Sequence, residues 1–207
     1  MTGPLNAKDY RLQESVRLKR ENDELREEVK GLRKFVHSMT AMYDAADSIR
    51  YDSQLYPFLR STLVEAMKIL NAPDGSLALI DDETDELVFV IVVGELEDTM
   101  TDHRMPMDDG IAGWVVRHAK PALVKNCRTD PRFYSGIDEV YSFKTHSMVA
   151  APLIGDRKVY GVIEILNHQG DEAFDDSDLA LLKLLCRGAG EVLADIDRLP
   201  TDEEQSR

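Results

Sequence analysis

A heptad repeat in the first third of the chain most constrains what the sequence can fold into. With Ser15 assigned to position a, apolar residues recur at positions a and d over more than three heptads, the length at which a coiled coil becomes the expected structure. One helix alone cannot bury a stripe this narrow, so the repeat predicts a partner helix. The predicted core positions are Leu18, Asn22, Leu25, Val29, Leu32 and Val36.

The same repeat predicts how many helices associate and in which direction. Val at position a with Leu at position d favours two parallel strands, and Asn22 at position a can hydrogen-bond to its own copy at some cost in stability. Glutamates at position g face basic residues at position e of the other chain. The three pairs are Glu14–Lys19, Glu21–Arg26 and Glu28–Arg33. We expect residues 1–50 to form a parallel homodimeric coiled coil, the alternative being a solvated helix packed on its own domain.

The charge of the chain limits which partners it can bind. The 39 acidic residues outnumber the 25 basic ones and give a formal net charge of -14. An acidic surface repels phosphate, so neither nucleic acid nor a membrane surface is an expected partner.

Residues 87–93 form the longest apolar stretch, too short to span a bilayer, and no signal peptide is evident. Two distant cysteines, Cys127 and Cys186, without a CxxC motif fit a reducing cytoplasm.

Hydrophobic periodicity after the repeat predicts a mixture of helices and strands. Apolar residues at helical spacing predict long helices near residues 55–70 and 176–199, and residues 110–119 predict a short buried helix. The expected strands are residues 76–81, 86–93, 103–107, 122–125, 147–154 and 159–167. Strand–helix–strand units do not repeat at the spacing of a parallel sheet. We therefore expect an α+β domain with an antiparallel sheet flanked by helices.

Several segments of this region together resemble the GAF domain family. They are DGIAGWV (109–115), NCRTDPRF (126–133), SFKTHSMVAAPL (142–153), VYGVIEILN (159–167) and FDDSDL (174–179). The resemblance covers residues 52–198, and we expect residues 199–207 to be a disordered acidic tail. It implies a dimeric signalling or regulatory protein that senses a small cytosolic ligand. The dimer would form through the coiled coil and the flanking helices, with a protein partner as its output.

Some members of this family, in phosphodiesterases and adenylyl cyclases, bind cyclic nucleotides between the sheet and short helices. The resemblance therefore implies cAMP or cGMP as a ligand and no other cofactor. Carried over by motif, the ligand-binding residues are Ser76, Ile111, Ala112, Tyr134, Asp138, Thr145 and Glu164. Backbone amides at 111 and 112 and the Thr145 hydroxyl would meet a phosphate. Glu164 or Asp138 would accept hydrogen bonds from a base.

The chain departs from the Asn-Lys…Phe…Asp-Glu signature of the nucleotide-binding members. The signature-like residues are Asn167, His168, Phe174 and Asp178. His168 replaces Lys, so the family's ion pair would become a pH-dependent His168–Asp178 pair, and Leu179 replaces Glu. Apart from Lys144 the region lacks a clear cation for a phosphate. The alternative function is therefore a dimerisation scaffold or protein-interaction adaptor without a ligand.

Catalytic and metal-binding signatures are missing from the sequence. It contains no HExxH, G-x-S-x-G, P-loop or paired-carboxylate motif. The three active-site cysteines of the free methionine-sulfoxide reductases, which also resemble GAF domains, are absent, and Cys127 lacks the context of a bilin attachment site. His118 or His146 as a haem ligand is the less favoured alternative to surface histidines. We predict that the chain is not an enzyme and binds no metal.

Overall fold

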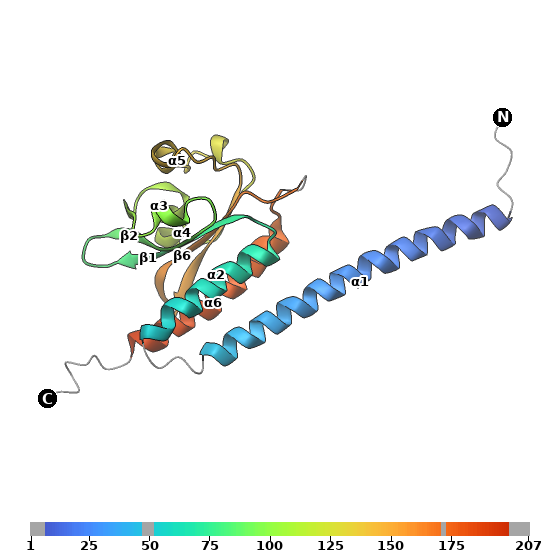
Figure 1. Cartoon of the computed structure of the whole chain (residues 1–207), viewed down its shortest axis with the longest axis horizontal. Helices are drawn as coiled ribbons and strands as arrows, with labels where there is room; N and C mark the ends of the chain where they lie inside the picture. Colours follow the sequence, from blue (N-terminus) through green and yellow to red (C-terminus); the bar gives the residue numbers. More distant parts are fainter. Residues whose placement is uncertain (1–6, 47–51, 171–172, 199–207) are drawn as a thin grey trace. The chain divides into compact units, whose positions relative to one another are not determined.

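The computed structural model describes residues 7–46, 52–170 and 173–198 (Figure 1). The chain divides into two compact units, Met1–Thr40 and Ala41–Arg207. The boundary predicted at residues 50–52 falls partly, and the predicted acidic tail wholly, outside the described residues. None of the described helices is both long and apolar enough to cross a bilayer.

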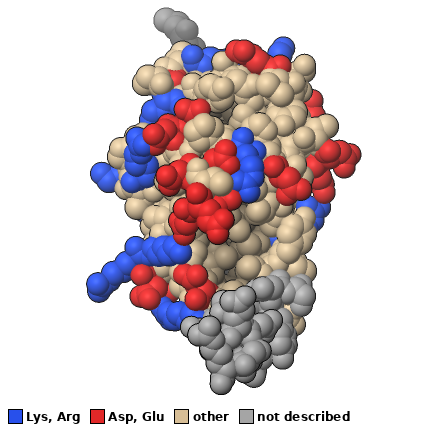
Figure 2. All heavy atoms as spheres, turned by 90° about the vertical axis from the view of Figure 1, so that its left-hand side faces the viewer, with Lys and Arg blue, Asp and Glu red and all other residues tan. Residues whose placement is uncertain are grey.

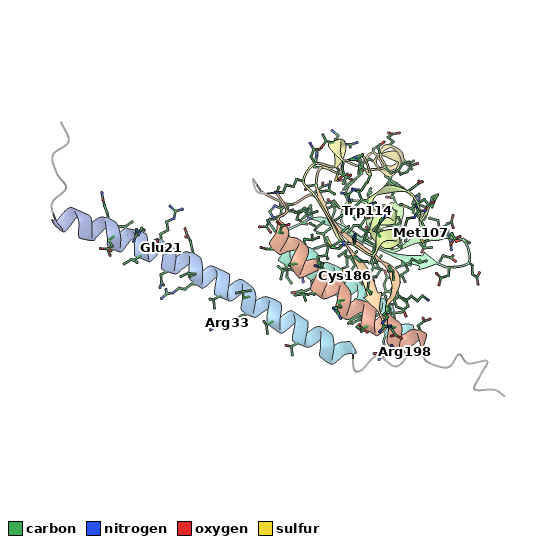
Figure 3. The ribbon with its side chains drawn as sticks, turned by 180° about the vertical axis from the view of Figure 1, so that it is seen from behind. Glu21, Arg33, Met107, Trp114, Cys186 and Arg198 are labelled. Carbon is green, nitrogen blue, oxygen red and sulfur yellow. The ribbon has the colours of Figure 1, made fainter. Side chains whose placement is uncertain are left out.

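The helix predicted for the heptad region is confirmed as α1, which spans Ala7–Ala46. Figure 3 shows Glu21 and Arg33 on this helix. The apolar heptad side chains that the structure describes are 44% exposed at Val29 and up to 60% exposed at Val36. Ion pairs one turn apart, such as Arg20–Glu24 at 2.8 Å, support the helix locally. Its pairing with a second copy stays a prediction.

A six-stranded antiparallel sheet forms the centre of the second unit. Its strand order is β3-β2-β1-β6-β5-β4. The strands are β1 (Asp74–Asp81), β2 (Glu86–Val93), β3 (Arg104–Pro106), β4 (Ala122–Val124), β5 (Met148–Gly155) and β6 (Lys158–Leu166). The central strands β1 and β6 are buried over most of their length, as their apolar sequences require. The predicted α+β fold with an antiparallel sheet flanked by helices is confirmed.

Two long helices cover one face of the sheet, and short helices cover the other (Figure 1). The long helices are α2 (Asp52–Ile69) and α6 (Asp176–Asp197), which pack on each other and on β1, β5 and β6. The short ones are α3 (Glu97–Met100), α4 (Gly110–His118), the 3-10 turn η1 (Cys127–Thr129) and α5 (Gly136–Tyr141). The α6 helix begins at a capping box, in which the side-chain carboxylates of Asp175 and Asp178 each accept the backbone N–H of the other residue.

Two glycines bring α6 unusually close to the sheet. A Cβ atom built on Gly190 of α6 would lie 2.4 Å from the backbone of Ile154, and one built on Gly155 of β5 would lie 2.0 Å from the carbonyl oxygen of Gly190. No side chain fits at either position, so the helix backbone rests directly on the strand backbone. This close approach fixes α6 against β5 without intervening side chains.

Acidic and basic side chains are interspersed on the face of the molecule in Figure 2. Arg104 pairs with Asp81 and Glu86, both at 2.8 Å, which ties β3 to the β1–β2 hairpin. These contacts lower the pKa of both carboxyls, chiefly through their hydrogen bonds to the guanidinium. Arg104 is thus occupied in holding the hairpin together.

Candidate ligand-binding site

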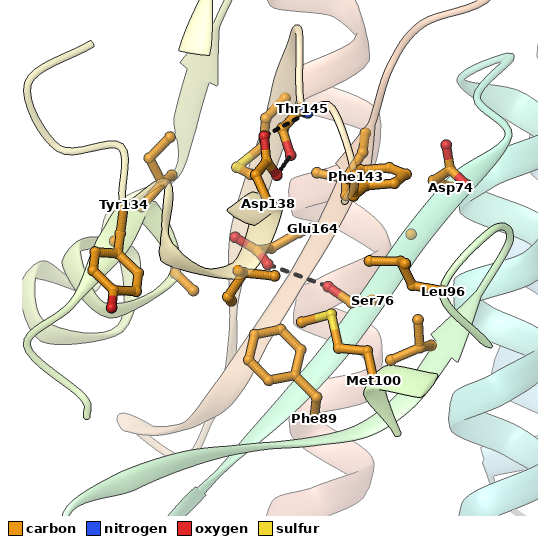
Figure 4. Close-up of a pocket in the computed structure, with 18 of the residues that line it drawn as sticks. Asp74, Ser76, Phe89, Leu96, Met100, Tyr134, Asp138, Phe143, Thr145 and Glu164 are labelled. Atoms are coloured by element: carbon orange, nitrogen blue, oxygen red, sulfur yellow. Dashed lines mark hydrogen bonds between the residues drawn. The ribbon is translucent and has the colours of Figure 1, made fainter. Parts of the chain in front are cut away.

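A pocket lies between the sheet and the short helices (Figure 4). The cavity has a volume of about 70 Å³. Its walls are mainly apolar, with side chains from β2, the α3 region, α4, α5 and β5. The apolar lining includes Phe89, Val92, Leu96, Met100, Met105, Ile111, Ala112, Phe133, Ile137, Phe143, Met148 and Leu166.

Two polar side chains on the central strands form the floor of this pocket. Ser76 on β1 and Glu164 on β6 are directly opposite in the antiparallel register, so both point to the same face. The Ser76 hydroxyl donates a hydrogen bond to Glu164 Oε2 at 3.2 Å. Ser76 and Glu164 are 4% and 7% exposed, respectively. A carboxyl group therefore lies at the floor of an apolar pocket. Among the described residues, the Ser76 hydroxyl is the one group that donates a hydrogen bond to it.

Burial changes the acidity of this carboxyl group. It raises the pKa of Glu164 to about 7, and the hydrogen bond from Ser76 opposes that rise only in part. Near neutral pH the group is therefore divided between its neutral and its charged form. A titrating group inside a concave pocket is a common feature of binding and catalytic sites.

Asp138 forms a second polar centre at the cover of the pocket. Its side chain on α5 accepts hydrogen bonds from the Thr145 hydroxyl at 2.7 Å and from the Thr145 backbone N–H at 2.9 Å. Arg128 donates to the same carboxylate at 2.6 Å. Because Asp138 is only 5% exposed, these contacts join α5, η1 and the segment before β5 at a buried point. The network holds the cover of the pocket in place.

The described lining of the pocket carries acidic groups and no basic ones. Asp74, Asp138 and Glu164 are part of it, whereas Lys, Arg and His are absent from the described residues that line it. Lys144, the cation suggested by the sequence, is exposed and is not among the lining residues. The pocket therefore offers no basic side chain to a ligand phosphate.

The structure places all seven predicted ligand-binding residues along this one pocket. Ser76 and Glu164 lie at its floor, Ile111 and Ala112 belong to α4, and Tyr134 is half exposed at its edge. Asp138 and Thr145 also line it, but their polar atoms bind each other. A binding role for the seven stays a prediction. The sequence did not identify Asp74 as a lining residue. It also did not identify the aromatic wall of Phe89, Phe133 and Phe143, because the only signal of these three residues in the sequence is hydrophobicity.

The signature-like residues lie at the end of β6 and the start of α6. Asn167 adopts a left-handed φ of 60°, accepts the His146 N–H and donates to the Lys144 carbonyl, which positions the segment before β5. His168 packs edge-on against the buried ring of Phe174, with ring centroids 5.3 Å apart. His168 Nδ1 has no hydrogen-bond partner among the described residues, so the predicted pair with Asp178 does not form through that atom.

The two cysteines are poorly suited to nucleophilic chemistry. Cys127, the first residue of η1, is buried, and desolvation raises the pKa of its thiol to about 12. Cys186 is buried on α6 (Figure 3), where desolvation also raises its pKa. Within the described part of the chain, no group of three or more His, Cys, Asp or Glu residues could hold a metal ion.

A family model described as the GAF domain matches residues 55–194 of the sequence. This chain belongs to the GAF domain family. The match begins within α2 and ends within α6, so it contains the whole sheet and the pocket.

Solved structures show the same fold at low sequence identity. The GAF domain of a phosphoenolpyruvate-protein phosphotransferase from Coxiella burnetii is 17% identical, with a TM-score of 0.68 over 79% of this chain and 94% of that chain. A methyl-accepting chemotaxis protein, residues 122 to 287, is 18% identical, with a TM-score of 0.63 over 77% and 96%. Free methionine-R-sulfoxide reductase from Neisseria meningitidis is 18% identical, with a TM-score of 0.60 over 78% and 90%. Membership of the GAF family and the signalling proteins among these neighbours support a sensory or regulatory role.

Proposed function

We propose that this GAF protein is a dimeric cytoplasmic sensor. It binds a small molecule in the pocket between the sheet and the short helices, and the flanking helices relay that event to a protein partner. The observation that carries the proposal is Glu164, a carboxyl group kept at the floor of an otherwise apolar pocket. Cyclic AMP and cyclic GMP stay candidate ligands to be tested, although the described lining has no basic side chain for their phosphate.

The energetics of Glu164 support a binding role over a packing role. A carboxyl group buried without full hydrogen bonding is unfavourable, and an apolar residue of similar volume would stabilise the sheet better. The Ser76 hydroxyl satisfies only part of its hydrogen-bonding capacity. A group that lowers stability at the floor of a pocket is best explained by what it binds.

The exposed stripe on α1 supports the dimer. Leu18, Leu25 and Leu32 are each more than half exposed, and one helix alone cannot bury them. A parallel second copy would cover all three and would place Glu21 of one chain against Arg26 of the other. Two sensor domains would then share one pair of helices.

We further propose a non-catalytic role. A thiol whose pKa is raised by burial is a weak nucleophile at neutral pH, and this applies to both Cys127 and Cys186. The reductase among the structural neighbours shares the fold at 18% identity. A shared fold at this identity is no argument that this chain has the activity of the reductase.

A thermal-shift screen tests the proposal. The 207-residue chain is heated alone and with cAMP, cGMP, amino acids, nucleobases and polyamines, each at up to millimolar concentration. A true ligand at 100 times its Kd stabilises the folded state by about 2.7 kcal/mol. Glu164→Gln should reduce that shift, whereas Glu83→Gln, the same change in an exposed hairpin turn, should preserve it.

One observation favours the alternative of a scaffold without a ligand. Asp138 and Thr145, two of the polar groups facing the pocket, are bound to each other rather than left open. A scaffold would form the dimer yet show no shift with any compound in the screen. Sedimentation that finds a dimer, combined with a melting temperature unchanged throughout the screen, would replace the sensor proposal with the scaffold.

A further inference from the structure

Resting on the proposed function, we infer that the pocket selects small organic cations. The ligand class is an amine, amidine or guanidine on an apolar or aromatic body, with its N–H groups bound to Glu164. Anions of the same size and shape are excluded. Two properties of the pocket lead to this assignment. They are the number of hydrogen-bond partners that each polar group already has and the sign of the charge that each group carries.

Glu164 is the acidic group at the floor of the pocket, and it has capacity left for a ligand. A carboxylate has about four acceptor positions, and the described residues supply one donor, the Ser76 hydroxyl at 3.2 Å. Figure 4 shows one Glu164 oxygen turned toward Ser76 and the other turned away from it, among the lining side chains. No described Lys, Arg or His forms an ion pair with this carboxyl.

Of the other two acidic groups of the lining, Asp138 is already engaged. It accepts from Thr145 twice and forms an ion pair with Arg128, which balances its charge. Asp74 is half-buried, and its Oδ1 accepts the backbone N–H of Glu95 at 2.9 Å. The charge at the floor of the pocket is therefore that of Glu164, and the described lining holds no basic side chain to balance it. When Glu164 is ionised, the field inside the pocket favours a cation and opposes an anion.

The walls of the pocket suit an organic cation better than a hydrated metal ion. Phe89, Phe133 and Phe143 provide aromatic surface, and Met100 and Met105 provide polarizable sulfur. Aromatic rings attract desolvated organic cations, whereas a metal ion requires several oxygen ligands or retained water. The described residues contain no cluster of three or more such ligands. A cation with an apolar body satisfies both the carboxyl and the walls.

Binding of a cation should depend on pH through this carboxyl. The groups that face Glu164 are the Ser76 hydroxyl on β1 and Asp138 on α5, with Asp74 and Tyr134 elsewhere on the lining. The charge of Glu164 also contributes to the raised pKa of the Cys127 thiol. With a pKa of about 7, Glu164 is ionised to about one part in ten at pH 6 and about nine parts in ten at pH 8. Affinity for a cation should rise about tenfold over that range.

An isosteric series of probes tests the inference on the 207-residue chain. Benzamidine, benzamide and benzoate share one shape and differ in charge, being cationic, neutral and anionic. Titration calorimetry at pH 6 and pH 8 should find benzamidine bound at least tenfold more tightly than benzamide, with no binding of benzoate. The affinity for benzamidine should rise about tenfold from pH 6 to pH 8, in line with the ionisation of Glu164.

Three variants locate the effect. Glu164→Gln should lose at least tenfold in benzamidine affinity, Glu164→Asp should recover part of it, and Glu83→Gln should match the wild type. Unfolding midpoints of all three confirm that they remain folded.

Preferred binding of benzoate or cAMP, or benzamidine binding unchanged by Glu164→Gln, would overturn the cation assignment while leaving the pocket a ligand site. The same holds if no probe of the series binds but a neutral or anionic compound from the thermal-shift screen does. If no compound binds in either assay, the proposed function fails together with this inference.

Discussion

Replacing Glu164 by Gln should remove a pH-dependent loss of stability from the GAF domain. The pKa of this carboxyl is about 7 in the folded protein, against an ordinary value of 4.5. A raised pKa means that the folded state holds the proton more tightly than the unfolded state does. The resulting stabilisation is complete below pH 4.5 and is lost as the pH rises through 7.

The magnitude follows from the two pKa values. Their difference, 7 minus 4.5, at 1.36 kcal/mol for each pH unit corresponds to about 3 kcal/mol in total. Integrating the linkage relation assigns most of this, about 2–3 kcal/mol, to the interval between pH 5 and pH 8. Gln has nearly the same shape and does not titrate, so Glu164→Gln should gain about 2–3 kcal/mol relative to the wild type between pH 5 and pH 8.

The assay is urea unfolding followed by the fluorescence of Trp114, the single tryptophan of the chain, which lies on α4. Free energies of unfolding are measured at several pH values from 5 to 8 for the wild type, Glu164→Gln and the exposed control Glu83→Gln. The free energy of unfolding of the control should change with pH in the same way as that of the wild type. If the difference in free energy of unfolding between Glu164→Gln and the wild type stays constant from pH 5 to pH 8, the Glu164 carboxyl does not titrate in this range. Burial would then not be what governs its charge.

Three further results are expected from other parts of the molecule. Asn22→Val should raise the thermal stability of the predicted coil while adding higher oligomers in sedimentation; a pure dimer would contradict its assignment to a core a position. Gly190→Ala should cost about 1–3 kcal/mol in urea unfolding, because its Cβ would meet the Ile154 backbone at 2.4 Å. Asp138→Ala should cost about 2–3 kcal/mol and speed hydrogen exchange around Thr145, whose hydroxyl and N–H both lose their acceptor; unchanged exchange there would show that the cover is held by packing alone.

Local sequence patterns predicted most of the fold, because most of its helices and strands are determined by residues that lie close together in the sequence. The strand at Glu86–Val93 and the start of α6 at Asp176 agree with the prediction. A run rich in β-branched and aromatic residues favours a strand, and an acidic cap favours a helix start, through effects that act within a few positions. The four-residue helix Glu97–Met100 was missed. A single turn carries no periodicity, and its position depends on the tertiary contacts of the buried Met100.

The sequence predicted which residues line the site, but it did not predict which of them bind each other. Motif resemblance named Asp138, Thr145 and Glu164, and all three line the pocket. It could not show that Asp138 and Thr145 bind each other, because that contact depends on the left-handed turn at Ser142 between them. Nor could it show that Lys144 lies outside the lining, because neighbouring positions in an irregular segment have no fixed facing.

The alternation of side chains along β6 gives the proposed sensor a physical route from ligand to helix. Glu164 points into the pocket, while its neighbours Ile163 and Ile165 are fully buried in the core on the α2 and α6 side. The α6 helix also packs directly on β6. A ligand that draws Glu164 toward the pocket therefore acts on the same strand backbone that supports α6. With Gly190 in direct backbone contact with the sheet, α6 has no flexible side-chain layer there to absorb a strand shift. The ligand would change the output only if it binds two arrangements of these helices with different affinity.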